Sequence, residues 1–101
     1  MSKVYVLNKG AAHDFSAAEE YGELIYCTHG RLQKYDVGQM VRECSDAMSE
    51  SMPDDFILLT SLTTLCSVAC SLFAVKHNLL NLLIYKDDKY VVRKIDFNNC
   101  N

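Results

Sequence analysis

The sequence has few features that interrupt a compact domain: it contains one proline, Pro53, and no segment of low complexity. Half of its 101 residues are hydrophobic, enough for one core but too few for a second domain. Extensive disorder is therefore excluded, and loose chain is expected only at residues 1–2 and 98–101. We predict a single domain over residues 1–101.

The sequence also lacks a cluster of acidic residues or of basic residues. The formal net charge is −3, and acidic and basic residues are interspersed. Nonspecific binding to nucleic acid needs clustered Lys and Arg to neutralise phosphates, so nucleic acid is not the expected partner. If the chain did bind it, through Lys9, Arg31, Lys34 and Arg42, affinity would fall steeply with salt.

The usual catalytic and phosphate-binding motifs are absent. There is no G-x-G-x-x-G or Gly-Lys-Ser/Thr loop and no G-x-S-x-G nucleophile elbow. His13 and Asp14 with Ser16 or Ser61 contain the residue types of a Ser–His–Asp system, which geometry rather than chain order defines. Adjacent His and Asp in one loop rarely face each other, however. The sequence favours a binding protein without catalytic residues over an enzyme.

Cysteine occurs five times, an odd number, mostly within apolar patterns, and the residues before the first strand lead us to expect no signal peptide. We therefore expect reduced, buried thiols in a cytoplasmic protein. Cys66 and Cys70 lie one helical turn apart, a spacing that metal ligands use, but no second Cys or His pair matches it. No metal and no cofactor is predicted.

Five runs have strand character: Lys3–Asn8, Glu23–Thr28, Phe56–Thr60, Leu79–Tyr85 and Tyr90–Phe97. Three helical segments separate the first four. They are a short one at Ala17–Tyr21 behind a Ser16–Glu19 capping box, an amphipathic one behind an Asp36–Gln39 box, and an apolar one over Leu62–His77. Asn78 suits the left-handed position that ends the last helix.

This alternation predicts an α/β fold. Strand–helix–strand connections are right-handed and make neighbouring strands parallel, whereas the tight turn at Asp87-Asp88 makes the last strand antiparallel. We predict a Rossmann-like, mostly parallel five-stranded sheet of order 2-1-3-4-5 with helices on both faces. An alternative is that Phe56–Val75, twenty residues without a charge, spans a membrane. Its six hydroxyl side chains and the β character of its start favour a strand followed by a buried helix, and no membrane partner.

In open α/β sheets, ligands bind beyond the carboxyl ends of the strands, where the strand order reverses. For the predicted order, this point lies between the first and third strands. It gathers eight candidate ligand-binding residues from two loops: Asn8, Gly10, His13, Asp14, Ser16, Thr60, Ser61 and Thr63. Two helix N-termini point there, so a nucleotide or another anionic small molecule is the predicted ligand of a sequestering module or hydrolase. The alternative is that these hydroxyls only cap helices.

Other polar residues are interpreted as structural. The pairs Asp54-Asp55 and Asp87-Asp88 adjoin strands and are expected to be solvated turn residues. His29 precedes Gly30 in a turn, and His77 ends a helix, where the helix dipole favours it.

The helix over Leu62–His77 is too uniformly apolar to be covered easily within a small monomer. We therefore expect a protein partner and a symmetric homodimer. The amphipathic helix after Asp36 and the edge strand Tyr90–Phe97 are the candidate surfaces for self-association.

Two stretches carry a resemblance: residues 8–19, from Asn8-Lys9-Gly10 to Glu19, and residues 53–83, from Pro53-Asp54-Asp55 to Leu83. They resemble small α/β proteins found in bacteriophage genomes, a group without a diagnostic catalytic motif. The resemblance implies action in the bacterial cytosol during infection, in counter-defence or host takeover. Ser61 stands where the resemblance leads us to expect glycine, which would make a ligand's approach to the backbone less close.

Overall fold

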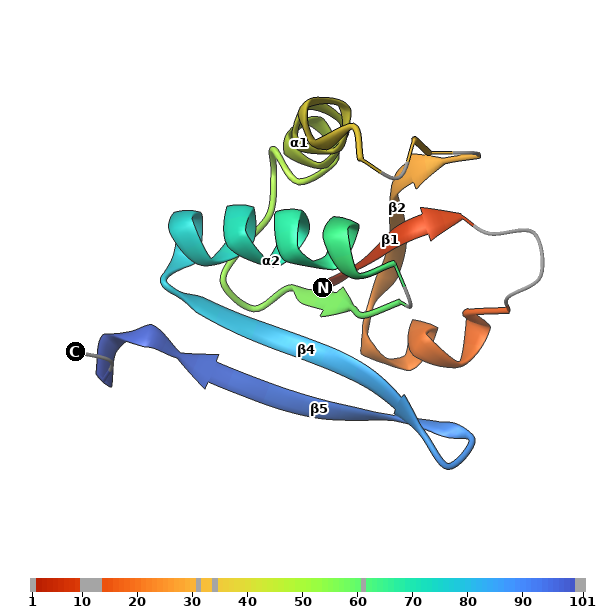
Figure 1. Cartoon of the computed structure of the whole chain (residues 1–101). Helices are drawn as coiled ribbons and strands as arrows, with labels where there is room; N and C mark the ends of the chain where they lie inside the picture. The colour runs from red at the N-terminus through yellow and green to blue at the C-terminus, as the bar shows by residue number, and fades with distance from the viewer. Residues whose placement is uncertain (1, 10–13, 31, 34, 61, 100–101) are drawn as a thin grey trace.

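A computed structural model describes residues 2–9, 14–30, 32–33, 35–60 and 62–99. Five strands form one sheet of order β2-β1-β3-β4-β5, in which the pairs are parallel except for the antiparallel β4–β5 hairpin (Figure 1). The predicted fold class and strand order are confirmed. The strands are β1 (Lys3–Lys9), β2 (Glu23–His29), β3 (Phe56–Leu58), β4 (Leu79–Lys86) and β5 (Lys89–Asp96). The helices are η1 (Ser16–Tyr21), α1 (Val37–Ala47), α2 (Thr63–His77) and η2 (Phe97–Asn99), where η marks a 3-10 helix.

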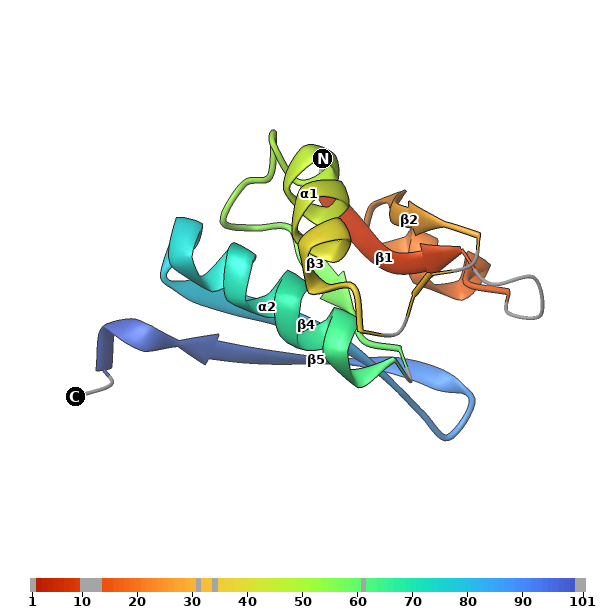
Figure 2. The same cartoon turned by 45° about the horizontal axis from the view of Figure 1, so that its top comes forward.

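Both α-helices lie on the same face of the sheet, as Figure 2 shows. Their buried side chains pack on strand residues of that face: Tyr5, Leu7 and Ile57 meet Met40, Cys44, Leu65, Ala69 and Phe73. On the opposite face, strand side chains pack against Ala18 of η1 and Tyr90 of β5. Helices therefore cover both faces of the sheet. The face opposite α1 and α2 is covered by the short 3-10 helix η1.

Two of the predicted helix ends are confirmed. The carboxylate of Asp36 caps α1, because its Oδ1 accepts the N–H of Gln39 at 3.0 Å. Asn78 ends α2 with a φ of 60°, the left-handed conformation expected there.

The prediction of a capping box formed by Ser16 and Glu19 is wrong. Phe15 precedes η1 and makes no side-chain cap. Instead Asp14 Oδ1 accepts the N–H of Ser16 at 2.9 Å, since an aspartate readily hydrogen-bonds the backbone two residues ahead.

The membrane alternative is also wrong. Residues 56–75 divide into β3 and most of α2, with Leu59 still donating its N–H to Leu83 O at 3.1 Å after β3 has ended. Among the described residues, no helix has the length and apolar character needed to cross a bilayer. Residues 98 and 99, expected to be loose, belong to η2, at whose start Phe97 donates its N–H to Asn78 O at 3.2 Å.

Candidate functional site

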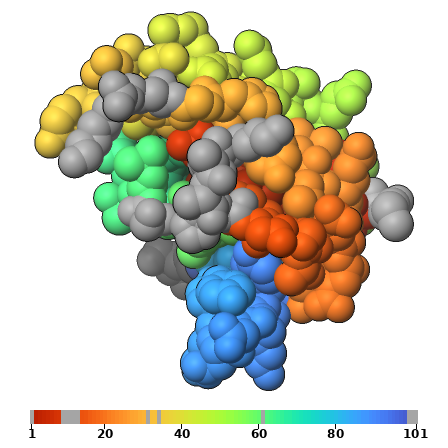
Figure 3. Space-filling view, turned by 90° about the vertical axis from the view of Figure 1, so that its right-hand side faces the viewer, coloured from red at the N-terminus to blue at the C-terminus, as the bar shows by residue number. Residues whose placement is uncertain are grey.

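The predicted ligand site depends on β1 and β3 lying side by side. They do: Val4 pairs with Phe56, Tyr5 with Ile57 and Val6 with Leu58, all in parallel register. The two strands therefore end at the same edge of the sheet, which Figure 3 shows from the front.

A groove of about 460 Å³ opens at this edge. It lies between the segment that enters η1, the end of β3 and the β4–β5 hairpin, one strand further along the sheet than predicted. We call it the carboxyl-edge groove; its lining residues are Asp14, Phe15, Leu58, Leu59, Thr60, Ile84, Tyr85 and Tyr90. Two of the predicted site residues, Asp14 and Thr60, are thus brought together.

The remaining predicted residues do not join them. Asn8 Oδ1 lies 3.1 Å from the hydroxyl of Thr28, so it links β1 to β2. Ser16 holds Asp14 through its N–H, and Thr63 starts α2, where its carbonyl accepts the Ser67 hydroxyl at 3.0 Å. Gly10, His13 and Ser61 lie outside the described residues.

Aromatic rings form much of the groove wall. Tyr85 and Tyr90 make an edge-to-face pair with ring centroids 5.2 Å apart, and Phe15 lies on the side of η1. The Tyr21 hydroxyl donates to Tyr90 O at 3.1 Å, which holds η1 against β5. The sequence reasoning missed Phe15, Tyr85 and Tyr90, although two tyrosines flanking a tight hairpin turn were a visible signal.

The charge in the groove is negative. Hydrogen bonds from the backbone and side chain of Ser16 lower the pKa of Asp14, so this carboxylate is ionised at neutral pH. Burial, with the nearby Tyr85 and Asp14, raises the pKa of Tyr90, whose hydroxyl therefore stays neutral. None of the described lining residues carries a positive charge.

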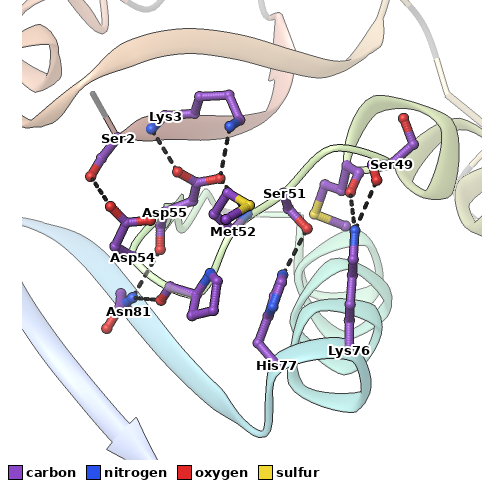
Figure 4. A network of polar contacts seen from close by, with 12 residues as sticks. Ser2, Lys3, Ser49, Ser51, Met52, Asp54, Asp55, Lys76, His77 and Asn81 are labelled. Carbon is purple, nitrogen blue, oxygen red and sulfur yellow. Dashed lines mark hydrogen bonds and ion pairs between the residues drawn. The ribbon is translucent and has the colours of Figure 1, made fainter.

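A second polar cluster lies at the opposite, amino-terminal edge (Figure 4). Asp55 is 1 % exposed, so its interpretation as a solvated turn residue is wrong. Its carboxylate accepts the N–H groups of Lys3 and Met52 at 2.9 and 2.8 Å and lies 3.2 Å from Lys3 Nζ. The chain buries it because these three donors replace water. Its position directly before an apolar strand was the only sequence signal.

The rest of this cluster joins the segment before β3 to its neighbours. Asn81 donates to the carbonyls of Pro53 and Asp55 at 2.8 and 3.0 Å. Ser51 Oγ lies 2.9 Å from His77 Nε2, a pairing that serine hydrolases use. Ser51 is buried, and we interpret the cluster as a structural lock, a set of contacts that hold the segment before β3 against β1, α2 and β4.

The four cysteines in the described part of the chain are free thiols, each buried or half-buried. Cys27 and Cys44 are buried in the core, as predicted. Cys66 Sγ donates to Thr60 O at 3.3 Å, and burial raises the pKa of Cys70 to about 11, so that thiol stays protonated. Within the described part of the chain, no three His, Cys, Asp or Glu side chains gather as a metal site would require.

The two α-helices form another surface. A groove of about 410 Å³ runs between Val41 of α1 and the outer side of α2, and ends at Lys76. Val75 is 88 % exposed here, and Val37 lies one turn before Val41 and is also exposed. We call this surface the helical face; its groove is lined by Val41, Ser67, Val68, Ser71, Leu72, Val75 and Lys76.

Comparison with known families gives one result. A family model described as "Phage Pam3 gp32-like protein" matches residues 2–99. No curated protein and no solved structure is significantly similar to the chain.

Proposed function

The chain belongs to the phage Pam3 gp32-like family, and we propose that it is an accessory protein that acts inside the infected bacterium by binding another protein through the helical face. Counter-defence or host takeover is the proposed setting. The observation that carries this proposal is the uncharged, apolar outer side of α2.

A surface helix normally presents charged residues to water. From Thr63 to Val75, α2 has none, and its exposed positions follow one another at intervals of four residues: Thr63, Ser67, Ser71 and Val75. This spacing places them on one stripe of the helix.

The stripe is less polar than its composition indicates. Ser67 already donates its hydroxyl to Thr63 O at 3.0 Å, so it does not depend on water for a hydrogen bond. Beside it, Val41 of α1 and Leu72 of α2 line the same groove. Contiguous apolar surface of this kind is typical of protein interaction sites.

The expected occupant is therefore an apolar, uncharged segment of a protein. A second copy of the chain would fit the same description, so the predicted homodimer is a competing occupant of the helical face. The other candidate surface, the free edge of β5, is less suitable. Lys89, Arg93 and Lys94 line that strand, and lysine on an edge strand opposes pairing with another strand.

The test compares two aspartate substitutions. Val75→Asp puts a charge on the helical face, and Met52→Asp puts one on a different exposed apolar residue, which is 55 % exposed. Tagged wild type and both variants are used as bait in lysate of infected bacteria. We expect a stoichiometric protein that wild type and Met52→Asp retain and Val75→Asp loses. Equal recovery by both variants would overturn the helical face as the binding surface.

A further inference from the structure

We infer that the carboxyl-edge groove is a binding site for an organic cation, an alkylammonium or guanidinium group, held against the rings of Tyr85, Tyr90 and Phe15 with Asp14 as its counter-charge. This site is separate from the helical face and does not depend on the function proposed for it.

The geometry of the walls supports a cation. Aromatic faces carry negative electrostatic potential and attract ammonium and guanidinium groups within about 6 Å of the ring centroid. The rings of Tyr85 and Tyr90 are steeply inclined to each other, at 64°, and both line the groove. Phe15 supplies a third ring from the side of η1.

The walls are also fixed in place. Tyr85 Oη donates to Asp88 Oδ1 at 3.3 Å across the hairpin turn, and Tyr21 Oη donates to Tyr90 O at 3.1 Å between η1 and β5. A site whose rings are already positioned loses less conformational entropy when it binds. The floor, made by Leu58, Leu59 and Ile84, is apolar and keeps water away from the bound group.

The electrostatics decide between ligand classes. An anion, as predicted from the two helix starts, would meet the ionised carboxylate of Asp14 and no described cationic side chain in the groove. A neutral apolar ligand would cover Asp14 without compensating its charge, which is unfavourable. A cation satisfies both the carboxylate and the ring faces. The cationic group can belong either to a free amine or to a basic side chain of a protein.

The probe is choline, compared with its neutral isostere in which carbon replaces the quaternary nitrogen. Titration of the full chain is followed by NMR of the Phe15, Tyr85 and Tyr90 signals. We expect saturable shifts with choline and affinity at least about tenfold weaker for the isostere, the factor that 1.4 kcal/mol of cation–π and charge attraction gives. Equal affinities would overturn the proposal, as would the absence of saturable shifts with choline.

Two charge-removing variants test whether Asp14 itself contributes to choline binding. Asp14→Asn keeps an acceptor for the N–H of Ser16 but removes the charge, and we expect about tenfold weaker choline binding. Asp46→Asn, on the exposed side of α1, is the matched control and leaves binding unchanged. Unchanged affinity in Asp14→Asn would contradict the assigned counter-charge. Val75→Asp retains choline binding, so failure of the helical-face proposal is distinguished from failure of this one.

The source of the cation is tested with free arginine amide and an arginine-containing peptide. Tighter binding of the peptide identifies a protein side chain as the natural occupant, and equal binding identifies a free amine. Both results support the site, and the absence of shifts with both probes counts against it.

Discussion

Lys3 and Asp55 meet twice: the backbone N–H of Lys3 reaches Asp55 Oδ1 at 2.9 Å, and its Nζ lies 3.2 Å from Oδ2. The first contact fixes the start of β1, and the second pairs a buried charge. Since Met52 also donates its N–H to the same carboxylate, one side chain connects β1 to the segment that leads into β3. β1 and β3 are neighbouring parallel strands in the interior of the sheet.

Asp55→Ala should therefore destabilise the protein by about 2–4 kcal/mol. The substitution leaves two partly buried N–H groups, of Lys3 and Met52, without this acceptor and the ammonium of Lys3 without its partner. Urea unfolding followed by circular dichroism measures the change. Asp54→Ala is the control: this neighbour is exposed and accepts only the Ser2 hydroxyl among its described contacts, so we expect a change within about 0.5 kcal/mol. Similar losses for the two variants would contradict the structural lock.

Gly22 lies at the amino-terminal edge of the sheet, where Asp55 also lies, and provides a second test of how that edge is held together. Its φ is 155°, and a Cβ added there would lie 2.2 Å from the carbonyl oxygen of Ser2. That carbonyl accepts the N–H of Glu23 at 3.1 Å and aligns β2 with β1, so it cannot easily move. Gly22→Ala should cost at least about 3 kcal/mol, from the unfavourable φ together with the displaced backbone.

Gly30→Ala is the matched control for Gly22→Ala. Gly30 also has a positive φ, 73°, but an added Cβ there would meet no atom of the described residues within 4 Å. The expected cost is only about 1 kcal/mol, the conformational penalty alone. Thermal unfolding of the two variants side by side gives the difference, and equal losses would show that the backbone near Ser2 adapts to the methyl group.

The sequence predicted the sheet well because strand and helix patterns are local and the crossover rule is strong. The five strands begin and end close to the predicted residues, and β3 is shorter because only three of its residues pair regularly. The Ser16–Glu19 capping box failed for a local reason. Asp14 competes for the same backbone N–H groups, and spacing alone does not show which acceptor is used.

The site was harder to predict because it depends on packing between distant segments. Asp14 and Thr60 were found from the rule on strand ends, whereas Tyr85 and Tyr90 enter the groove because the hairpin folds back beside β3. Asp55 shows the same limit. Its place directly before an apolar strand does not by itself show burial, because the donors that make burial favourable, from Lys3 and Met52, are positioned only by the fold.

His77 should make stability depend on pH. Burial and the adjacent Lys76 lower its pKa in the folded protein below the usual value of about 6.5. The folded state thus favours the neutral ring, which lies 2.9 Å from Ser51 Oγ. Between the two pKa values the unfolded chain binds more protons, so stability rises with pH. This contribution is fully present above about pH 6.5 and is lost as the pH falls below it.

The measurement is the urea midpoint of wild type and His77→Gln between pH 7.5 and 5. We expect the wild-type midpoint to fall more steeply than that of the variant in the acidic part of this range. Glutamine keeps a polar group near Ser51 but does not titrate, so a general effect of carboxylates appears in both proteins. Parallel curves would show that His77 contributes nothing to the pH dependence.

The predicted homodimer is tested most directly by mass in solution. If two copies pack through their helical faces, light scattering at micromolar concentration gives twice the chain mass of 11.4 kDa. Val75→Asp then gives the monomer, because each copy would bury an unpaired carboxylate at the interface, weakening association by at least about 100-fold. Met52→Asp, which places the same charge outside the helical face, stays dimeric. A monomer in wild type would leave the face to a different protein. A dimer that survives Val75→Asp would place self-association elsewhere, with the edge of β5 as the next surface to test by Val92→Pro, since proline removes a backbone donor from that strand.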